Sequence, residues 1–85
     1  MRSFSYTIKN PVGMHARPAS LLAKEIKNYQ SEVTITRDGE TFDAGKVLML
    51  MSMGLKCGEE VVVEVSGDDE ETAIASIEAF FKANL

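Results

Sequence analysis

The chain has 85 residues, of which 45% are hydrophobic and 26% are charged. A chain of this size buries about 60% of the surface that it exposes when unfolded, which suffices for one small core and excludes a large multi-domain enzyme. The 9 basic and 13 acidic side chains give a net charge of −4, which argues against a general nucleic-acid binder or a protein held on an anionic membrane. We therefore expect one domain over residues 1–85, in which any anion site is local.

Cysteine and histidine content limits the chemistry further. The one cysteine, Cys57, cannot form an internal disulfide. Because the chain has only one cysteine and one histidine, it has no zinc-type ligand cluster. The N-terminal segment lacks the continuous apolar stretch of a signal peptide, and no apolar run reaches the ~18 residues of a membrane span. We expect a soluble, cytoplasmic protein that uses neither a metal nor a cofactor.

The first half of the chain predicts a strand and then a helix. Phe4, Tyr6 and Ile8 alternate with serine and threonine, which predicts an extended segment with one apolar face. From Ala16 to about Asn28 the apolar residues recur at helical spacing. Pro18 falls in the first turn of this helix, where a missing N–H group is tolerated.

A hairpin and a second helix are expected next. Val33 to Thr36 and Thr41 to Phe42 predict two strands, joined by a two-residue turn at Asp38-Gly39. Val47 to Met53 is a nearly unbroken apolar run. We interpret it as a short helix because leucine and methionine favour helix, and a buried strand is the alternative.

The C-terminal third predicts a strand and a final helix. Val61, Val63 and Val65 mark the strand, and Asp68, three residues before Glu71, predicts an acidic capping box. The buried stripe expected for the helix is Ile74, Ile77 and Phe81, joined by Ala73 and Phe80. The order is therefore βαββαβα, an α+β sandwich of two layers in which three helices cover one face of a four-stranded sheet and serine, threonine and glutamate line the other.

The residues best suited to chemistry lie at the start of the first predicted helix. The only histidine, His15, stands there, and Arg17 follows two residues later. A first helical turn leaves backbone N–H groups unpaired and carries about half a positive charge, so an anion is stabilised there. This field favours the neutral, nucleophilic imidazole, and a guanidinium suits phosphate oxygens. The alternative is that His15 is only a capping or surface residue.

Missing motifs narrow the role of such a site. The chain has no Walker-type loop, no Gly-rich kinase loop and no cluster to hold Mg²⁺ with a nucleotide. We therefore expect a protein that receives a phosphoryl group and passes it on.

The second predicted helix is too short to bury every side chain. We expect Val47, Leu50 and Met51 to belong to the core. Some of the following side chains should reach solvent and form an adaptable apolar patch: Leu48, Met49, Met51 and Met53.

Residues 13–19, Gly-Met-His-Ala-Arg-Pro-Ala, closely resemble the active-site stretch of the HPr family, the histidine-containing phosphocarriers of the bacterial sugar phosphotransferase system. The likeness covers essentially the whole chain, including the Asp38-Gly39 hairpin, residues 51–54 and Ser66-Gly67. It implies an open-faced β-sandwich with an antiparallel sheet in the order 1-4-2-3. It also implies a monomer that is charged by Enzyme I at the expense of phosphoenolpyruvate and that delivers to the A domains of sugar permeases.

The resemblance also implies roles for individual residues. His15 would bear the phosphoryl group on Nδ1, and Arg17 would steady it together with the backbone amides of Ala16 and Arg17. The positions that match the family's docking surface are Ser20, Lys24 and Lys27 on the first helix and Val47, Leu48 and Met51 on the second.

One position departs from the family pattern. HPr proteins commonly carry a serine at the start of the second helix, and in many Gram-positive bacteria a dedicated kinase phosphorylates it. This chain has Lys46 there, which cannot accept that mark and which the helix dipole mildly disfavours. We expect the protein to escape this kinase and to be a poor corepressor in catabolite control. Lys46 also adjoins the docking positions.

Other roles stay open at this point. Within the family, the alternative is a regulatory paralogue that serves a nitrogen-type or otherwise specialised branch. From another class, a protein-interaction or RNA-binding module is compatible with a small α+β sandwich, although the chain has no paired-aromatic stacking platform and an acidic balance. A metal-dependent enzyme fails on the number of ligands.

Overall fold

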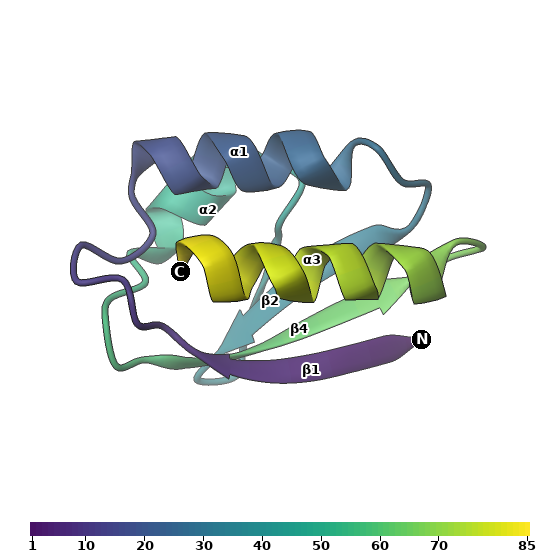
Figure 1. The fold of residues 1–85 in the computed structure, drawn as a ribbon. Helices are drawn as coiled ribbons and strands as arrows, with labels where there is room; N and C mark the ends of the chain where they lie inside the picture. Colours follow the sequence, from purple (N-terminus) through teal and green to yellow (C-terminus); the bar gives the residue numbers. More distant parts are fainter.

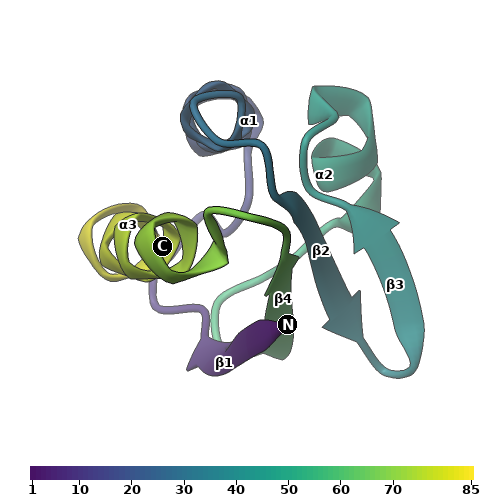
Figure 2. The ribbon, with the colours of Figure 1, turned by 90° about the vertical axis from the view of Figure 1, so that its right-hand side faces the viewer.

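A four-stranded antiparallel sheet carries three helices on one face (Figures 1 and 2). The computed structural model describes residues 1–85. The elements in chain order are β1 (Arg2–Thr7), α1 (Ala16–Ile26), β2 (Glu32–Arg37), β3 (Glu40–Asp43), α2 (Val47–Met53), β4 (Glu60–Ser66) and α3 (Glu70–Asn84). The strands lie in the order β1-β4-β2-β3, so the predicted fold class and sheet order are confirmed.

Alternation along the strands divides the sheet into a dry face and a wet face. One row across the sheet runs through Phe4, Val63, Ile35 and Phe42, and Val63 and Ile35 are fully buried in it. The neighbouring row on the other face runs through Ser3, Glu64, Thr34 and Asp43. Val62 interrupts this polar face with a side chain that is 38% exposed.

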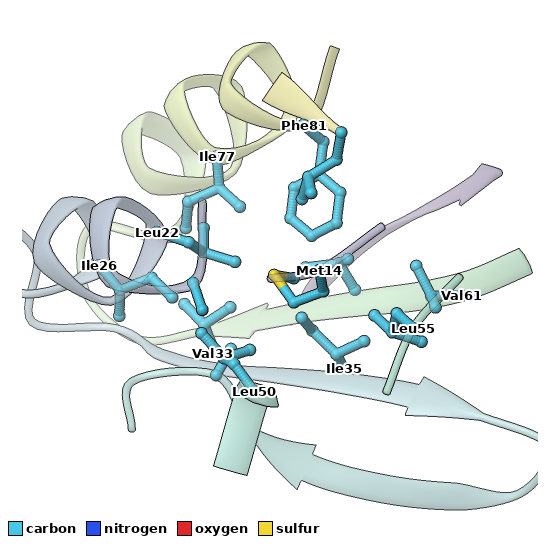
Figure 3. Close-up of a cluster of buried hydrophobic side chains, with 14 of the residues drawn as sticks. Met14, Leu22, Ile26, Val33, Ile35, Leu50, Leu55, Val61, Ile77 and Phe81 are labelled. Carbon is cyan, nitrogen blue, oxygen red and sulfur yellow. The ribbon is translucent and has the colours of Figure 1, made fainter. Parts of the chain in front are cut away.

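The core fills the space between the helices and the dry face of the sheet (Figure 3). Leu22 and Ile26 reach into it from α1, and Ile77 and Phe81 reach into it from α3. The side chain of Met14, which lies in the loop before α1, points into the same cluster and is 5% exposed. Burial of this side chain therefore anchors the residue next to His15. No helix combines the length and the apolar character that crossing a bilayer requires.

Helix α2 buries a narrower face than predicted. Leu50 and Met53 are buried, whereas Leu48 is 82% exposed and Met51 is 43% exposed. The expectation that Met51 belongs to the core is wrong. Leu50 and Met53 are three positions apart and share one face of the helix, while Met51 is turned by about 100° from Leu50.

The predicted capping box at Asp68 and Glu71 is also wrong, because α3 begins at Glu70. Its side chain reaches back instead, and Oε1 accepts the N–H of Gly67 at 3.2 Å. Asp69 points away from the helix and accepts the N–H groups of Gln30 and Ser31, at 2.8 and 3.0 Å, and the Ser31 hydroxyl. Asp69 thus ties the start of α3 to the segment before β2.

This tie predicts a pH-dependent contribution to stability. The hydrogen bonds to Asp69, that of the Ser31 hydroxyl first, hold its pKa below the ordinary value of 3.8. Because the folded-state pKa is the lower one, the stabilisation is present above the ordinary value and is lost as the pH falls through the folded-state pKa. Asp69→Asn should therefore lower the denaturation midpoint at neutral pH and approach the wild type in acid.

Chemical denaturation at a series of pH values measures this difference. Asp68→Asn, at an exposed neighbour without a side-chain hydrogen bond, is the control and should follow the wild type throughout. A deficit of Asp69→Asn that stays constant with pH would contradict this interpretation.

Candidate functional site

The loop between β1 and α1 is held from two sides. The N–H of Met14 donates to the carbonyl of Leu55 at 2.9 Å, and the N–H of Gly13 donates to the carbonyl of Asn10 at 2.9 Å. Gly13 has a φ of +76°, a conformation that glycine adopts without strain. A side chain at this position would collide with the carbonyl oxygen of Leu55. The backbone that leads into His15 is therefore closely packed against the segment after α2.

His15 is the N-cap residue of α1, directly before the first helical residue, Ala16. Its backbone is extended, with φ −104° and ψ −176°, and its carbonyl accepts the N–H of Ala19 at 3.0 Å. The imidazole makes no capping hydrogen bond, and the residue is half-buried. The ring is therefore not engaged by the backbone of the helix that it precedes.

The first turn of α1 presents free hydrogen-bond donors. No acceptor within the protein pairs with the N–H of Ala16 or of Arg17, and Pro18 has no N–H. Such unpaired donors, together with the aligned peptide dipoles, make this end of the helix electropositive. The helix begins directly after His15, as predicted.

His15 and Arg17 line the same surface depression, of about 280 Å³, here called the His15 hollow. Arg17 is exposed and forms no ion pair within the protein. The other lining residues are Asn10, Pro18, Leu21, Ala83 and Asn84. An anion in this hollow would meet a guanidinium and would lie beside the start of the helix, and none of the lining side chains is a carboxylate.

The positions expected to dock partners lie on two adjacent helices, α1 and α2 (Figure 2). The positions at α1 are exposed and follow Arg17 at intervals of three or four residues, which places them on one side of this helix: Ser20 and Lys24 on α1, and Lys27 directly after its last residue. Those on α2 are Val47, which is half-buried, and Leu48 and Met51, which are exposed. Lys46 is exposed and immediately precedes α2. We call the exposed residues of the two sets the docking face, which consists of Ser20, Lys24, Lys27, Leu48 and Met51.

Five residues of the His15 hollow are not among the predicted site residues, namely Asn10, Pro18, Leu21, Ala83 and Asn84. An asparagine before a proline is typical of a turn, and this signal could have drawn attention to Asn10. Nothing in the local sequence announces Asn84, because it is brought to the hollow by the far end of α3.

Comparison with known proteins finds similar chains over the full length. A family model described as the phosphorylation site of the HPr component of the phosphotransferase system matches residues 2–83. A phosphocarrier protein HPr of Mycoplasma genitalium is 38% identical over an alignment of 85 positions that covers 99% of this chain and 97% of that protein. The matched stretch includes every residue of the docking face and His15 itself.

Solved structures agree. The crystal structure of HPr-C-His from Thermoanaerobacter tengcongensis superposes with a TM-score of 0.92 at 31% identity and covers 98% of this chain and 93% of that one. The crystal structure of an HPr dimer from the same organism gives a TM-score of 0.76 at 31% identity, with 98% and 95% of the two chains covered. The fold is thus also found in a protein described as a dimer.

Proposed function

The chain belongs to the HPr family, the phosphocarrier proteins of the bacterial phosphotransferase system, and from this premise we propose that His15 carries the phosphoryl group. The observation that carries the proposal is the shared hollow. His15 and Arg17 line one depression at the start of α1, where two backbone N–H groups have no acceptor. A dianion on the imidazole is stabilised there by the helix dipole, by these donors and by a free guanidinium.

The chemistry of the transfer needs only the imidazole and its surroundings. The lone pair of His15 Nδ1 attacks the phosphorus of phospho-Enzyme I, and a P–N bond forms as the bond to the donor residue breaks. The proton on Nε2 stays in place, and Arg17 with the amides of Ala16 and Arg17 takes up the charge of the three phosphoryl oxygens. The reverse exchange delivers the group to a permease A domain, so the protein is a covalent intermediate in the relay and not its catalyst.

One docking face serves both exchanges in this proposal. Exposed Leu48 and Met51 provide an adaptable apolar centre, and Lys24 and Lys27 provide a basic rim beside it. Such a face favours fast and brief encounters with acidic partners over tight binding. Because a single chain supplies the whole hollow, we propose that the protein acts as a monomer.

We also propose a cellular compartment for the protein and the absence of one form of regulation. The thiol of Cys57 is free and exposed, which suits a reducing compartment, so we place the relay in the cytoplasm. Lys46 occupies the start of α2, where the family's regulatory serine is common, so we propose that the regulatory kinase does not mark this protein there.

The test is a labelling reaction with Enzyme I and phosphoenolpyruvate. The protein should gain one phosphate that is labile in acid and stable in alkali, and a permease A domain added afterwards should remove it. Offering sugar-permease and nitrogen-branch A domains side by side separates the carrier of sugar uptake from a regulatory paralogue. Failure to gain phosphate from an Enzyme I that charges another HPr would contradict the proposal.

Arg17→Ala should slow phosphoryl acceptance and leave stability unchanged. A hydrogen bond to a charged group contributes about 1.5–3 kcal/mol, so its loss in the transition state slows transfer roughly tenfold to a hundredfold. Stability should not change because Arg17 is exposed and unpaired. Rapid-quench measurement of the transfer rate from phospho-Enzyme I checks the first expectation, and thermal unfolding checks the second.

Arg2→Ala is the matched control, because it removes the same group from the far end of β1, where Arg2 pairs with Glu71. It changes the net charge equally and should leave the transfer rate as in the wild type. If both variants slow transfer equally, Arg17 acts only through net charge, and if both transfer at the wild-type rate, Arg17 has no role in transfer.

A further inference from the structure

We propose that Asn10 is a positioning residue for phosphoryl transfer, which holds the His15 hollow in shape by joining the loop before α1 to the last turn of α3. The inference deepens the proposed function and rests on it. Asn10 lines the hollow together with His15 and Arg17, and it is the only residue of the hollow whose side chain bonds to both the loop and α3.

Asn10 closes a turn in the loop that leads into His15. Its side-chain Oδ1 accepts the N–H of Val12 at 2.9 Å, and its carbonyl accepts the N–H of Gly13 at 2.9 Å. An asparagine side chain that accepts from the residue two positions on mimics a backbone turn. The path of the chain into His15 is therefore set by Asn10 on one side, as it is set by the burial of Met14 on the other.

Asn10 also links this loop to the end of α3. The side-chain Nδ2 of Asn10 donates to the carbonyl of Asn84 at 3.0 Å, and its backbone N–H donates to the carbonyl of Leu85 at 2.7 Å. Asn84 lies 74 positions along the chain, yet it lines the same hollow. One side chain thus sets the distance between the two walls of the hollow, the start of α1 and the end of α3.

Loss of these bonds should disturb the hollow without unfolding the protein. Val12 is 69% exposed, so water can replace the lost acceptor of its N–H, and Met14 keeps the loop attached to the core. The donors of α1 and the guanidinium of Arg17 would then be less well placed around the phosphoryl group, and small misplacements of this kind slow a transfer step. The docking face lies on α1 and α2 and is not touched, so encounter with Enzyme I should not change.

Steady-state transfer from phospho-Enzyme I tests this separation. Asn10→Ala should lower kcat about tenfold and leave KM for the carrier within about twofold of the wild type. Asn10→Ser keeps a hydroxyl acceptor for the N–H of Val12 but not the donor to Asn84, and its kcat should fall between the two. Asn28→Ala, the same change at an exposed position after α1, is the matched control and should equal the wild type.

The outcomes distinguish this inference from the function on which it rests. If Asn10→Ala and Asn28→Ala, both folded by circular dichroism, give equal kcat values, or if only KM rises, the positioning role is overturned and the carrier function stands. If Asn10→Ala does not fold, the comparison of Asn10→Ser with the wild type decides in the same way. If the wild type itself accepts no phosphate, the proposed function fails.

Discussion

His15→Ala should abolish phosphoryl acceptance and leave the fold intact. The chain has one histidine, so no other imidazole can take over the P–N bond. The ring is half-buried and makes no hydrogen bond to the helix, and the bond that starts α1 comes from the carbonyl of His15, which alanine retains. Incubation with Enzyme I and phosphoenolpyruvate, followed by intact-mass measurement, should show no added phosphate.

A competition experiment distinguishes loss of chemistry from loss of docking. The variant keeps the docking face on α1 and α2, so an excess of it should slow the phosphorylation of the wild-type protein by occupying Enzyme I. A His15→Ala protein that gains phosphate as the wild type does would rule out the mechanism. A variant that neither gains phosphate nor competes would show that the loss of phosphate reflects failed binding to Enzyme I.

Gly13→Ala should cause the largest loss of stability among single substitutions near the hollow. An alanine at a φ of +76° costs about 1–2 kcal/mol in conformational free energy. Its Cβ would also collide with the carbonyl oxygen of Leu55 and lie 3.0 Å from the Cα of Lys56. Relief of the collision displaces the Met14–Leu55 hydrogen bond, which adds about 1 kcal/mol. Because His15 follows Met14, acceptance of phosphate should slow as well.

Gly39→Ala provides a matched control for the collision. Gly39 has a similar φ of +82° in the β2–β3 turn, but an added Cβ would have nothing within 4 Å. It should therefore lose only the conformational part of the free energy of unfolding and transfer phosphate at the wild-type rate. Equal free energies of unfolding for the two variants, measured by urea denaturation, would show that the packing of Gly13 against Leu55 contributes nothing.

Local patterns were sufficient to predict most of the elements. The alternation of Val61, Val63 and Val65 predicts β4 because side chains on a strand alternate between its faces. Pro18 and the apolar spacing behind it place the start of α1 immediately after His15, which is the feature on which the site depends. The strand order did not follow from these patterns, because β1 and β4 lie far apart in the chain, and it came from the family resemblance.

The features that local sequence does not predict share one physical cause, which is contact between segments that lie far apart in the chain. Because Asp69 bonds to Ser31 and α3 begins at Glu70, the predicted capping box of Asp68 and Glu71 does not form. Asn84 reaches the hollow through the packing of α3. Met51 was assigned to the core because its type is apolar, but burial on a two-turn helix depends on the direction of the neighbouring elements. Each of these outcomes is decided by tertiary packing, which a local pattern does not encode.

The proposed function depends on one claim: the imidazole of His15 accepts the phosphoryl group at the electropositive start of α1. Phosphorus and nitrogen NMR of the histidine-labelled protein, after charging with Enzyme I and phosphoenolpyruvate, tests it directly. We predict one phosphorus bonded to Nδ1 of His15. A phosphorus bonded to Nε2, or to a serine or threonine oxygen with the ring unmodified, would contradict the account.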